Sequence, residues 1–137
     1  MADMNITLNI AASGLRAQTA RMKTIAENLA NASSTANTPG GDPYRRKVAN
    51  FGQVLDRESG VTQVRMTGVS RDKSDFKLRY DPTHPGADAN GYVKMPNVNT
   101  LLEAMDMREA QRAYEANLNV VESARAMLGK TIDLLRR

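Results

Sequence analysis

The stretch AENLANASSTANTPGGDPYRRKVAN, residues 26–50, is the place where a helical pattern stops and a different kind of chain begins. Residues 26–32 continue an apolar stripe that starts well before them. Serines, threonines and an asparagine follow, and then comes the break Pro39-Gly40-Gly41. Because proline cannot continue a helix and glycine adopts turn conformations freely, we interpret this stretch as a joint at which the chain leaves a helix and turns.

The residues before this joint carry an apolar stripe with heptad spacing. One row recurs every seven residues, and a second row lies three residues after the first. The rows are Leu8, Leu15, Met22 and Leu29, and Met4, Ala11, Ile25 and Ala32, with Gln18 as the one polar interruption. This spacing predicts a helix over residues 4–32 that presents one apolar face.

Residues 97–137 repeat the same kind of pattern and predict a second, longer helix. Its central row is Met107, Tyr114, Val121, Leu128 and Leu135, flanked by Ala110, Leu118, Ala124 and Ile132. Pro96 precedes the pattern. Asn97 and Thr100 are both candidates for the N-terminal cap, the latter because Glu103 follows it at capping-box spacing.

The middle of the chain has the alternation of half-buried strands. Residues 61–66 and 76–80 alternate apolar and polar side chains, and residues 47–51 are a candidate third strand. We therefore predict a small hairpin-like sheet within a mainly α fold. Three parts follow from this reading: an N-terminal helix in 1–35, a loop and small β segment in 36–96, and a C-terminal helix in 97–137.

Composition limits what the chain can be. Two Phe, four Tyr and no Trp among 137 residues are too few to build a large core. The absence of Cys excludes disulfides, zinc-thiolate sites and a thiol nucleophile. No apolar run approaches the roughly 20 residues that span a bilayer. The N-terminus lacks both a basic region and a continuous apolar region, which argues against a cleaved signal peptide.

The chain lacks a recognisable catalytic or cofactor site. His84 is the only histidine, has no partner base or ligand set in its surroundings, and is expected to be an exposed turn residue. The basic run Arg45-Arg46-Lys47 and the net charge of +4 favour a solvated or interface cluster over a nucleic-acid footprint. We predict no enzymatic activity, no metal and no cofactor.

The two apolar stripes indicate assembly. The middle segment is rich in Gly, Pro and polar groups and cannot cover both of them, so other chains must do so, or the ends stay disordered until they arrive. The chain is then either a subunit of a helical array or a soluble coiled-coil adaptor resembling an export chaperone. The residues expected at the assembly interface are Leu8, Leu15, Met22, Ile25, Leu29, Met107, Tyr114, Leu118, Val121, Leu128, Ile132 and Leu135.

Two short motifs resemble those of a known family. Asn28-Leu29-Ala30-Asn31 ends the first helix, and the second helix contains Arg112-Ala-Tyr-Glu-Ala-Asn, with Tyr114, Glu115 and Asn117. Together they resemble the axial proteins of the bacterial flagellum, which form its rod and hook. The usual Thr-x-Gly-Tyr turn of that family is replaced here by a longer insert at 35–47. With 81–85, 91–93 and 96–99, this variant resembles the basal-body rod proteins.

The resemblance implies a subunit of the proximal rod, a helical tube that crosses the periplasm and transmits torque. Its terminal helices would pair as a coiled-coil-like inner layer, with the middle segment outside. Implied partners are copies of itself, the rod proteins FlgB, FlgF and FlgG, a FliE-type adapter and the flagellar type III export apparatus, which exports family members unfolded and without cleavage. Phe51 and Leu55 match the family's loose export-gate element. Neither nucleic acid nor a small-molecule substrate is implied.

Overall fold

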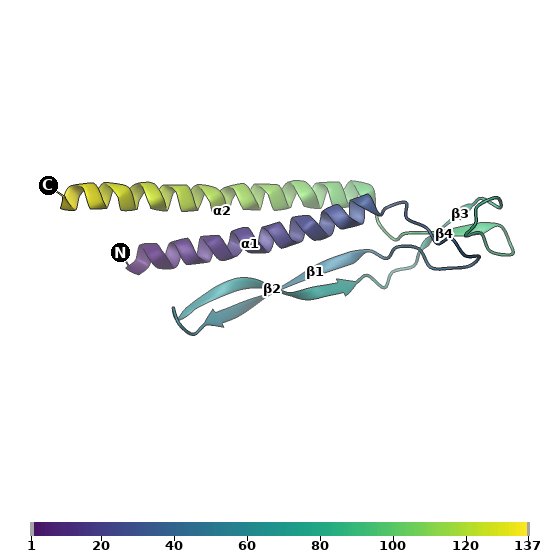
Figure 1. Ribbon diagram of the computed structural model, residues 1–137, viewed down its shortest axis with the longest axis horizontal. Coiled ribbons are helices and arrows are strands. Elements are labelled where there is room, and N and C mark those ends of the chain that lie inside the picture. The colour runs from purple at the N-terminus through teal and green to yellow at the C-terminus, as the bar shows by residue number, and fades with distance from the viewer. Residues whose placement is uncertain (1, 137) are drawn as a thin grey trace. The chain divides into compact units, whose positions relative to one another are not determined.

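A computed structural model describes residues 2–136 as two long helices and four strands (Figure 1). The helices are α1 (Ala2–Ala30) and α2 (Thr100–Leu135). The strands between them are β1 (Lys47–Asp56), β2 (Val61–Arg71), β3 (Lys77–Tyr80) and β4 (Tyr92–Met95). β1 pairs with β2, and β3 pairs with β4, as two separate two-stranded sheets. The predicted fold class, mainly helical with a small β part, is confirmed.

The chain divides into two compact units, and each unit contains part of both helices. The hairpin unit consists of residues 2–22, 50–68 and 108–136, so it includes the outer halves of β1 and β2. The joint unit consists of residues 23–49 and 69–107, including β3 and β4. Among residues 2–136, no helix is both long enough and apolar enough to cross a membrane.

In the hairpin unit, α1 and α2 lie antiparallel in close contact. A Cβ atom on Gly14 would come within 2.7 Å of Asn117 Nδ2, and seven residues further along α1, Arg21 forms an ion pair of 3.6 Å with Glu109. The residue number of the contact on α2 therefore falls as the residue number on α1 rises, which is the antiparallel order. Ala11 and Ala124 are buried. Small side chains let two helix backbones approach closely, and we call this contact the helix seam.

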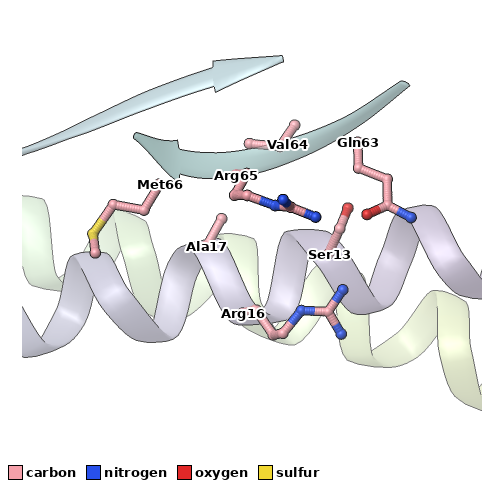
Figure 2. A pocket seen from close by; sticks show the side chains of 7 residues that line it. All are labelled: Ser13, Arg16, Ala17, Gln63, Val64, Arg65 and Met66. Carbon is pink, nitrogen blue, oxygen red and sulfur yellow. The ribbon is translucent and has the colours of Figure 1, made fainter. Parts of the chain in front are cut away.

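The other face of α1 in the hairpin unit meets β2. Figure 2 shows Gln63 pointing from β2 toward α1 beside Ser13, with Val64 on the opposite side of the strand. Ser13 and Gln63 are both buried. The turn between β1 and β2 closes through Gly60, which has a φ of +69° and donates its N–H to Asp56 O at 2.7 Å. The predicted strands at 47–51 and 61–66 are confirmed, and both are longer than predicted.

In the joint unit, β3 and β4 form a short antiparallel pair. Lys77 lies opposite Met95 and Tyr80 lies opposite Tyr92, and the two tyrosine rings meet edge to face at 5.3 Å. The sequence pattern predicted β3 but not β4, because four residues before a proline are too few to show alternation. A second separate sheet replaces the single sheet that was expected.

The helix ends differ from the predicted boundaries. Asn99 caps α2, because its Oδ1 accepts from the N–H groups of Leu101 and Leu102 at 3.1 and 3.3 Å. Both predicted caps, Asn97 and Thr100, are therefore wrong. α1 ends at Ala30, two residues before the predicted end.

The apolar core is small and made mostly of small side chains. Its buried apolar members are Ala11, Ala17, Ile25, Val93, Val98, Ala110 and Ala124. No aromatic residue is among them, as the composition predicted. Such a core stabilises the chain less than one built from large side chains, which gives buried polar contacts more weight.

Candidate functional site

The last turn of α1 is joined to β1 through the side chain of Asn28, in the joint unit. This buried amide donates Nδ2–H to Lys47 O at 2.8 Å, and its Oδ1 accepts from Lys47 N at 2.9 Å. Two residues opposite each other in neighbouring strands exchange the same pair of N–H and C=O hydrogen bonds. Asn28 therefore binds the first residue of β1 as a residue of a neighbouring strand would. Tyr44 donates its hydroxyl to the same Oδ1 at 2.7 Å.

The side chain of Asn31 lies at the end of α1 and bonds back to its last turn. Its Nδ2 donates to the carbonyl of Glu27 at 2.9 Å, and the same carbonyl accepts from the backbone N–H of Asn31 at 3.1 Å. Ser34 donates its hydroxyl to Asn31 Oδ1 at 3.0 Å. Further along the joint, Gly40 adopts a φ of +71°, a conformation that an L side chain rarely takes. The chain thus leaves the helix and turns as the sequence indicated.

Glu103 is the buried charge of the joint unit. It lies in the first turn of α2, where the helix dipole favours a negative charge. Its carboxylate accepts from Arg46 Nε and also from Asn28 Nδ2 at 3.4 Å. A buried carboxylate is stable only when paired and hydrogen-bonded, and both conditions hold here.

Arg46 connects this carboxylate to the loop after β2. Its Nη1 lies 3.3 Å from Asp72 Oδ2. Burial by itself would lower the pKa of the Arg46 guanidinium, but the hydrogen bond and charge of Glu103, joined by Asp72, raise it above its ordinary value. Hydrogen bonds from the backbone and side chain of Ser74 hold the pKa of Asp72 below its ordinary value. The Arg46 guanidinium and the Asp72 carboxylate therefore stay charged across the neutral range.

Asn97 completes the connection, although sequence reasoning gave it a different role. Its Oδ1 accepts from Arg46 N at 2.8 Å, and its Nδ2 donates to Asp72 O and Ser74 O at 3.0 and 3.1 Å. We call the side chains that tie α1, β1, the loop after β2 and α2 together the polar joint cluster. Its members are Asn28, Tyr44, Arg46, Asp72, Asn97 and Glu103.

The prediction that the basic run at 45–47 is a solvated cluster is wrong, whereas the alternative of an interface cluster stays a prediction. Arg45 stacks on Phe76, with 4.1 Å from Cζ to the ring centre, and donates to the carbonyls of Asp72 and Ser74. Lys47 lies 3.4 Å from Glu27. All three cations bind groups of their own chain, because the insert after α1 folds back over the start of β1.

His84 is half-buried rather than exposed, which corrects the expectation for this residue. Its Nδ1 accepts from Gly86 N at 2.8 Å, which leaves Nε2 as the protonated nitrogen, 3.1 Å from Thr35 Oγ1. Gly86 lies so close to Ala36 O that a Cβ atom would come within 2.4 Å of it. The histidine therefore helps to fasten the 81–91 turn to the joint.

The predicted interface residues fall into three groups by burial in the single chain. Ile25 is buried, and Ile132 and Leu135 are exposed at 41% and 74%. The others are half-buried: Leu8, Leu15, Met22, Leu29, Met107, Tyr114, Leu118, Val121 and Leu128. In the family motifs, Asn117 is half-buried, whereas Ala30 and Glu115 are exposed.

Phe51 and Leu55 lie on the face of the β1–β2 hairpin that points away from its buried side. Exposure alternates along β1 from Phe51 to Asp56, with the odd-numbered residues exposed. Val64 and Met66 of β2 are exposed as well, at 43% and 38%. Phe51 is exposed at 38% and does not pack beneath the sheet.

Sequence reasoning missed the buried charged group of the joint unit. Glu103 was read only as a capping-box partner, and Arg46 only as part of a charge run. A possible signal was the presence of a carboxylate in the first turn of a helix that also carries an apolar stripe. Its partner, however, lies 57 residues away and belongs to a loop with no periodicity.

Two family models match the two ends of the chain. The model described as "Flagella basal body rod protein" matches residues 8–40, which cover most of α1 and the joint. The model described as "Flagellar basal body rod FlgEFG protein C-terminal" matches residues 89–134, which cover β4 and α2. The matched segments therefore include both helices.

Curated relatives are similar over nearly the whole chain. A flagellar basal-body rod protein FlgC from Agrobacterium fabrum is 51% identical, covering 99% of this chain and 98% of the relative. Proteins of the same name from Salmonella typhimurium and Borreliella burgdorferi are 41% and 39% identical. They cover 98% and 95% of this chain, and 98% and 96% of their own lengths.

Proposed function

The chain belongs to the FlgC family of flagellar basal-body rod proteins, and from this premise we propose that it assembles helically into the proximal rod and transmits torque across the periplasm. A structural rod subunit of the flagellar basal body is what the family shows. The family is a structural one and not a known enzyme family. The position in the proximal rod, the helical arrangement and the mechanical role are the proposal.

The observation that carries the proposal is the amount of apolar side chain that α2 leaves exposed. Eight large apolar residues of α2 are exposed in the single chain: Leu101, Leu102, Met105, Val120, Met127, Ile132, Leu134 and Leu135. A helix that is apolar on more than one face is normally buried on more than one side. Neighbouring subunits in a tube would supply that burial, with the terminal helices forming the inner layer and the middle segment lying outside.

Torque transmission requires that the helical layer and the segment outside it move together. The polar joint cluster suits this requirement, because charged and amide groups from four chain segments hold one another at fixed distances. Directional bonds resist rotation better than apolar contacts, which can slide. We assign the cluster the role of a stiff joint between the end of α1 and the start of β1.

Rod proteins assemble with other basal-body components. We propose that the neighbours of this chain are its own copies, FlgB, FlgF, FlgG and a FliE-type adapter, and that the type III export apparatus delivers it unfolded and uncleaved. Phe51 and Leu55 would serve as the export-gate element. Phe51→Ala should then lower secretion at an unchanged cytoplasmic level. Normal secretion of that variant would remove Phe51 from the export role.

A pair of aspartate substitutions tests assembly separately from export. Val121 and Leu128 lie one heptad apart on α2 and are half-buried in the single chain. An aspartate at either position would place an unpaired charge between helices in every copy of the tube, at a cost of several kcal/mol. Export of the unfolded chain should continue, while rods, hooks and swimming are lost.

Glu122→Gln is the matched control, because Glu122 is exposed on the same helix. Secreted protein, hook number and motility are measured for Val121→Asp, Leu128→Asp and Glu122→Gln. Normal swimming by both aspartate variants would contradict burial of α2 in the assembled rod. Equal damage from Glu122→Gln would show that a different face of α2 is buried.

A further inference from the structure

A recess lies between α1 and β2 in the hairpin unit, and Figure 2 shows the side chains around it. On α1 its wall consists of Ser13, Arg16 and Ala17, which share one face because residues three and four apart are neighbours on a helix. Gly14 and Gln18, four residues apart, lie instead on the side of α1 that faces α2 across the helix seam. The recess has a volume of about 290 Å³, close to the roughly 300 Å³ of the smallest ligand pockets.

One polar side chain of the recess is nine-tenths buried and has no partner in the chain. Gln63 of β2 is 9% exposed, and Figure 2 shows its amide pointing from the strand toward α1 beside Ser13. This amide forms no hydrogen bond with any of residues 2–136. The Ser13 hydroxyl donates its only proton to Ile10 O at 2.7 Å. The Gln63 amide is therefore free to bind a group that enters the recess, and it meets only solvent in the free chain.

Two arginines give the recess a positive charge. Arg16 and Arg65 line it, and no Asp or Glu does. Neither guanidinium forms a hydrogen bond or an ion pair with any of residues 2–136. Hydrogen bonds from the Ser59 hydroxyl and the Glu58 N–H lower the pKa of Asp56, and the charge of Arg65 contributes less. Asp56 is thus held by its own turn, and both arginine charges stay uncompensated.

The three donor groups and their surroundings define the ligand. Gln63 and Arg65 are two positions apart on β2 and lie on the α1 side of the strand in Figure 2, toward Arg16 of the helix. A guanidinium is a planar fork that binds a carboxylate through two parallel N–H bonds, and the amide N–H adds a further donor. Ala17 and Met66 add apolar surface to the same wall. A carboxylate on a short apolar stem, which is a glutamate side chain, matches both parts.

We propose that this recess binds the carboxylate of a glutamate side chain from a neighbouring rod subunit, held by Arg16, Arg65 and Gln63. The inference rests on the proposed function, because the glutamate belongs to another subunit. Rod proteins assemble with other basal-body components, so such neighbours exist. The contact would fix the hairpin unit of one subunit to its neighbour through directional, charge-assisted bonds.

Cross-linking in isolated basal bodies tests the contact directly. Arg65→Lys keeps the positive charge and introduces an amine, which a carbodiimide couples to a carboxylate that touches it. We expect mass spectrometry to find position 65 joined to a glutamate of another chain. Arg57→Lys is the matched control, because Arg57 is exposed in the turn between β1 and β2 of the same unit. No inter-chain product, a product within one chain, or equal product from Arg57→Lys overturns the inference.

The stability of the free chain provides a second test. Arg16→Gln and Arg65→Gln should each change the thermal unfolding midpoint by less than about 2 °C, because neither guanidinium has a partner in its own chain. Arg46→Gln is the contrasting variant, since it removes the partner of the buried Glu103 and should lower the midpoint by several times as much. A fall in Arg65→Gln as large as in Arg46→Gln would show that Arg65 serves its own chain, and would overturn the inference.

Sodium propionate, which has the stem and carboxylate of a glutamate side chain, probes the recess without assembly. It should cause a saturable shift of the Gln63 side-chain amide resonances in the wild-type chain, measured against sodium chloride at equal ionic strength. Arg65→Gln should abolish the shift. Absence of a saturable shift, or a larger response to inorganic phosphate than to propionate, overturns the choice of a carboxylate.

The two proposals fail in different ways. Basal bodies that contain the Arg65→Lys chain but give no inter-chain product overturn only the role of the recess. If the free chain nevertheless binds propionate, the recess is a carboxylate site that no rod subunit fills, and the neighbour is overturned as its source. A wild-type chain that is secreted but absent from isolated rods contradicts the proposed function itself.

Discussion

The polar joint cluster and the helix seam each contain an amide side chain of α1 with a buried oxygen. The two amides differ in their hydrogen bonding. Asn28 donates to Lys47 O and accepts from Lys47 N and Tyr44, all within 2.9 Å. Gln18 buries an oxygen that has no donor among residues 2–136. The joint is complete within one chain, whereas the seam is not. Stability that the chain supplies for itself is therefore concentrated in the joint unit, and the hairpin unit depends more on what covers it.

The largest expected effect comes from removing the buried charge of the joint. Glu103→Ala leaves Arg46 and Asn28 without their shared acceptor, and it should lower the free energy of unfolding by about 3 kcal/mol. We place the loss at the low end for a broken buried pair because Arg46 keeps Asp72 as a partner. Urea unfolding followed by circular dichroism measures the loss. Glu115→Ala, at an exposed position of α2, should change the value by less than about 0.5 kcal/mol.

Similar losses in the free energy of unfolding from Glu103→Ala and Glu115→Ala would contradict the contrast between the buried joint and the exposed surface of α2. They would mean that the joint is as solvated as the surface of α2. Glu103→Gln sharpens the test, since it keeps the shape and one acceptor while removing the charge. It should fall between the wild-type chain and Glu103→Ala.

Asn28→Ala should follow in size. It removes the two bonds to Lys47 and the acceptor of Tyr44, and the expected loss is about 2 kcal/mol. Asn31→Ala removes one bond to a helical carbonyl and should cost about 0.5–1 kcal/mol. Hydrogen exchange of the Lys47 amide provides a local readout. Asn28→Ala should abolish its protection, and unchanged protection would show that β1 is held by other contacts.

Alanine substitutions at two glycines allow the helix seam to be compared with the exposed surface of the hairpin unit. An added Cβ at Gly129 meets nothing within 4 Å, so Gly129→Ala should stabilise the chain by about 0.5–1 kcal/mol through helix propensity alone. The same change at Gly14 pushes into the Asn117 amide, and we expect a loss of about 1 kcal/mol. Adding Asn117→Ala to Gly14→Ala should recover that loss. Equal gains at both glycines would show that the seam is loose.

The helices and the joint could be predicted from the sequence because their signals are local. Heptad rows extend over four or five repeats, and Pro39, Gly40 and the asparagines before them stand at the end of one such row. Asn31 could be assigned to the last helical carbonyls because that contact spans one turn. These features depend on residues within a few positions of one another.

The rest depended on contacts between distant residues. Asn97, Asn99 and Thr100 all had capping chemistry, and the choice of Asn99 followed from Asn97 being engaged by Arg46 and Asp72. The partners of His84 and of the basic run likewise come from segments far away in the sequence. A single sequence carries no signal for such pairs. Gln18 was visible as an interruption, but its missing donor could be seen only in three dimensions.

The effect expected at Tyr44 is also small, and its dependence on pH separates a hydrogen bond from simple packing. Burial, and then the charges of Glu27 and Glu103, raise the pKa of the Tyr44 phenol above its ordinary value. A group whose pKa is raised on folding stabilises the folded state below its unfolded pKa, near 10 for tyrosine, and loses that contribution as pH rises through the folded value.

At pH 8 the neutral hydroxyl donates to Asn28 Oδ1, so Tyr44→Phe should cost about 0.5–1 kcal/mol. Above pH 10, the folded wild-type chain either keeps the Tyr44 hydroxyl protonated, although a free phenol would be ionised, or holds a phenolate near the carboxylates of Glu27 and Glu103. Either state lowers the stability of the folded chain relative to the unfolded chain. The difference between wild type and Tyr44→Phe should therefore shrink as pH rises through the unfolded value near 10 and on through the raised folded value. Urea unfolding at a series of pH values measures it, and taking the difference cancels the titration of other groups. A difference that stays constant over this range would mean that the ring only fills space and that the hydroxyl adds nothing to the joint.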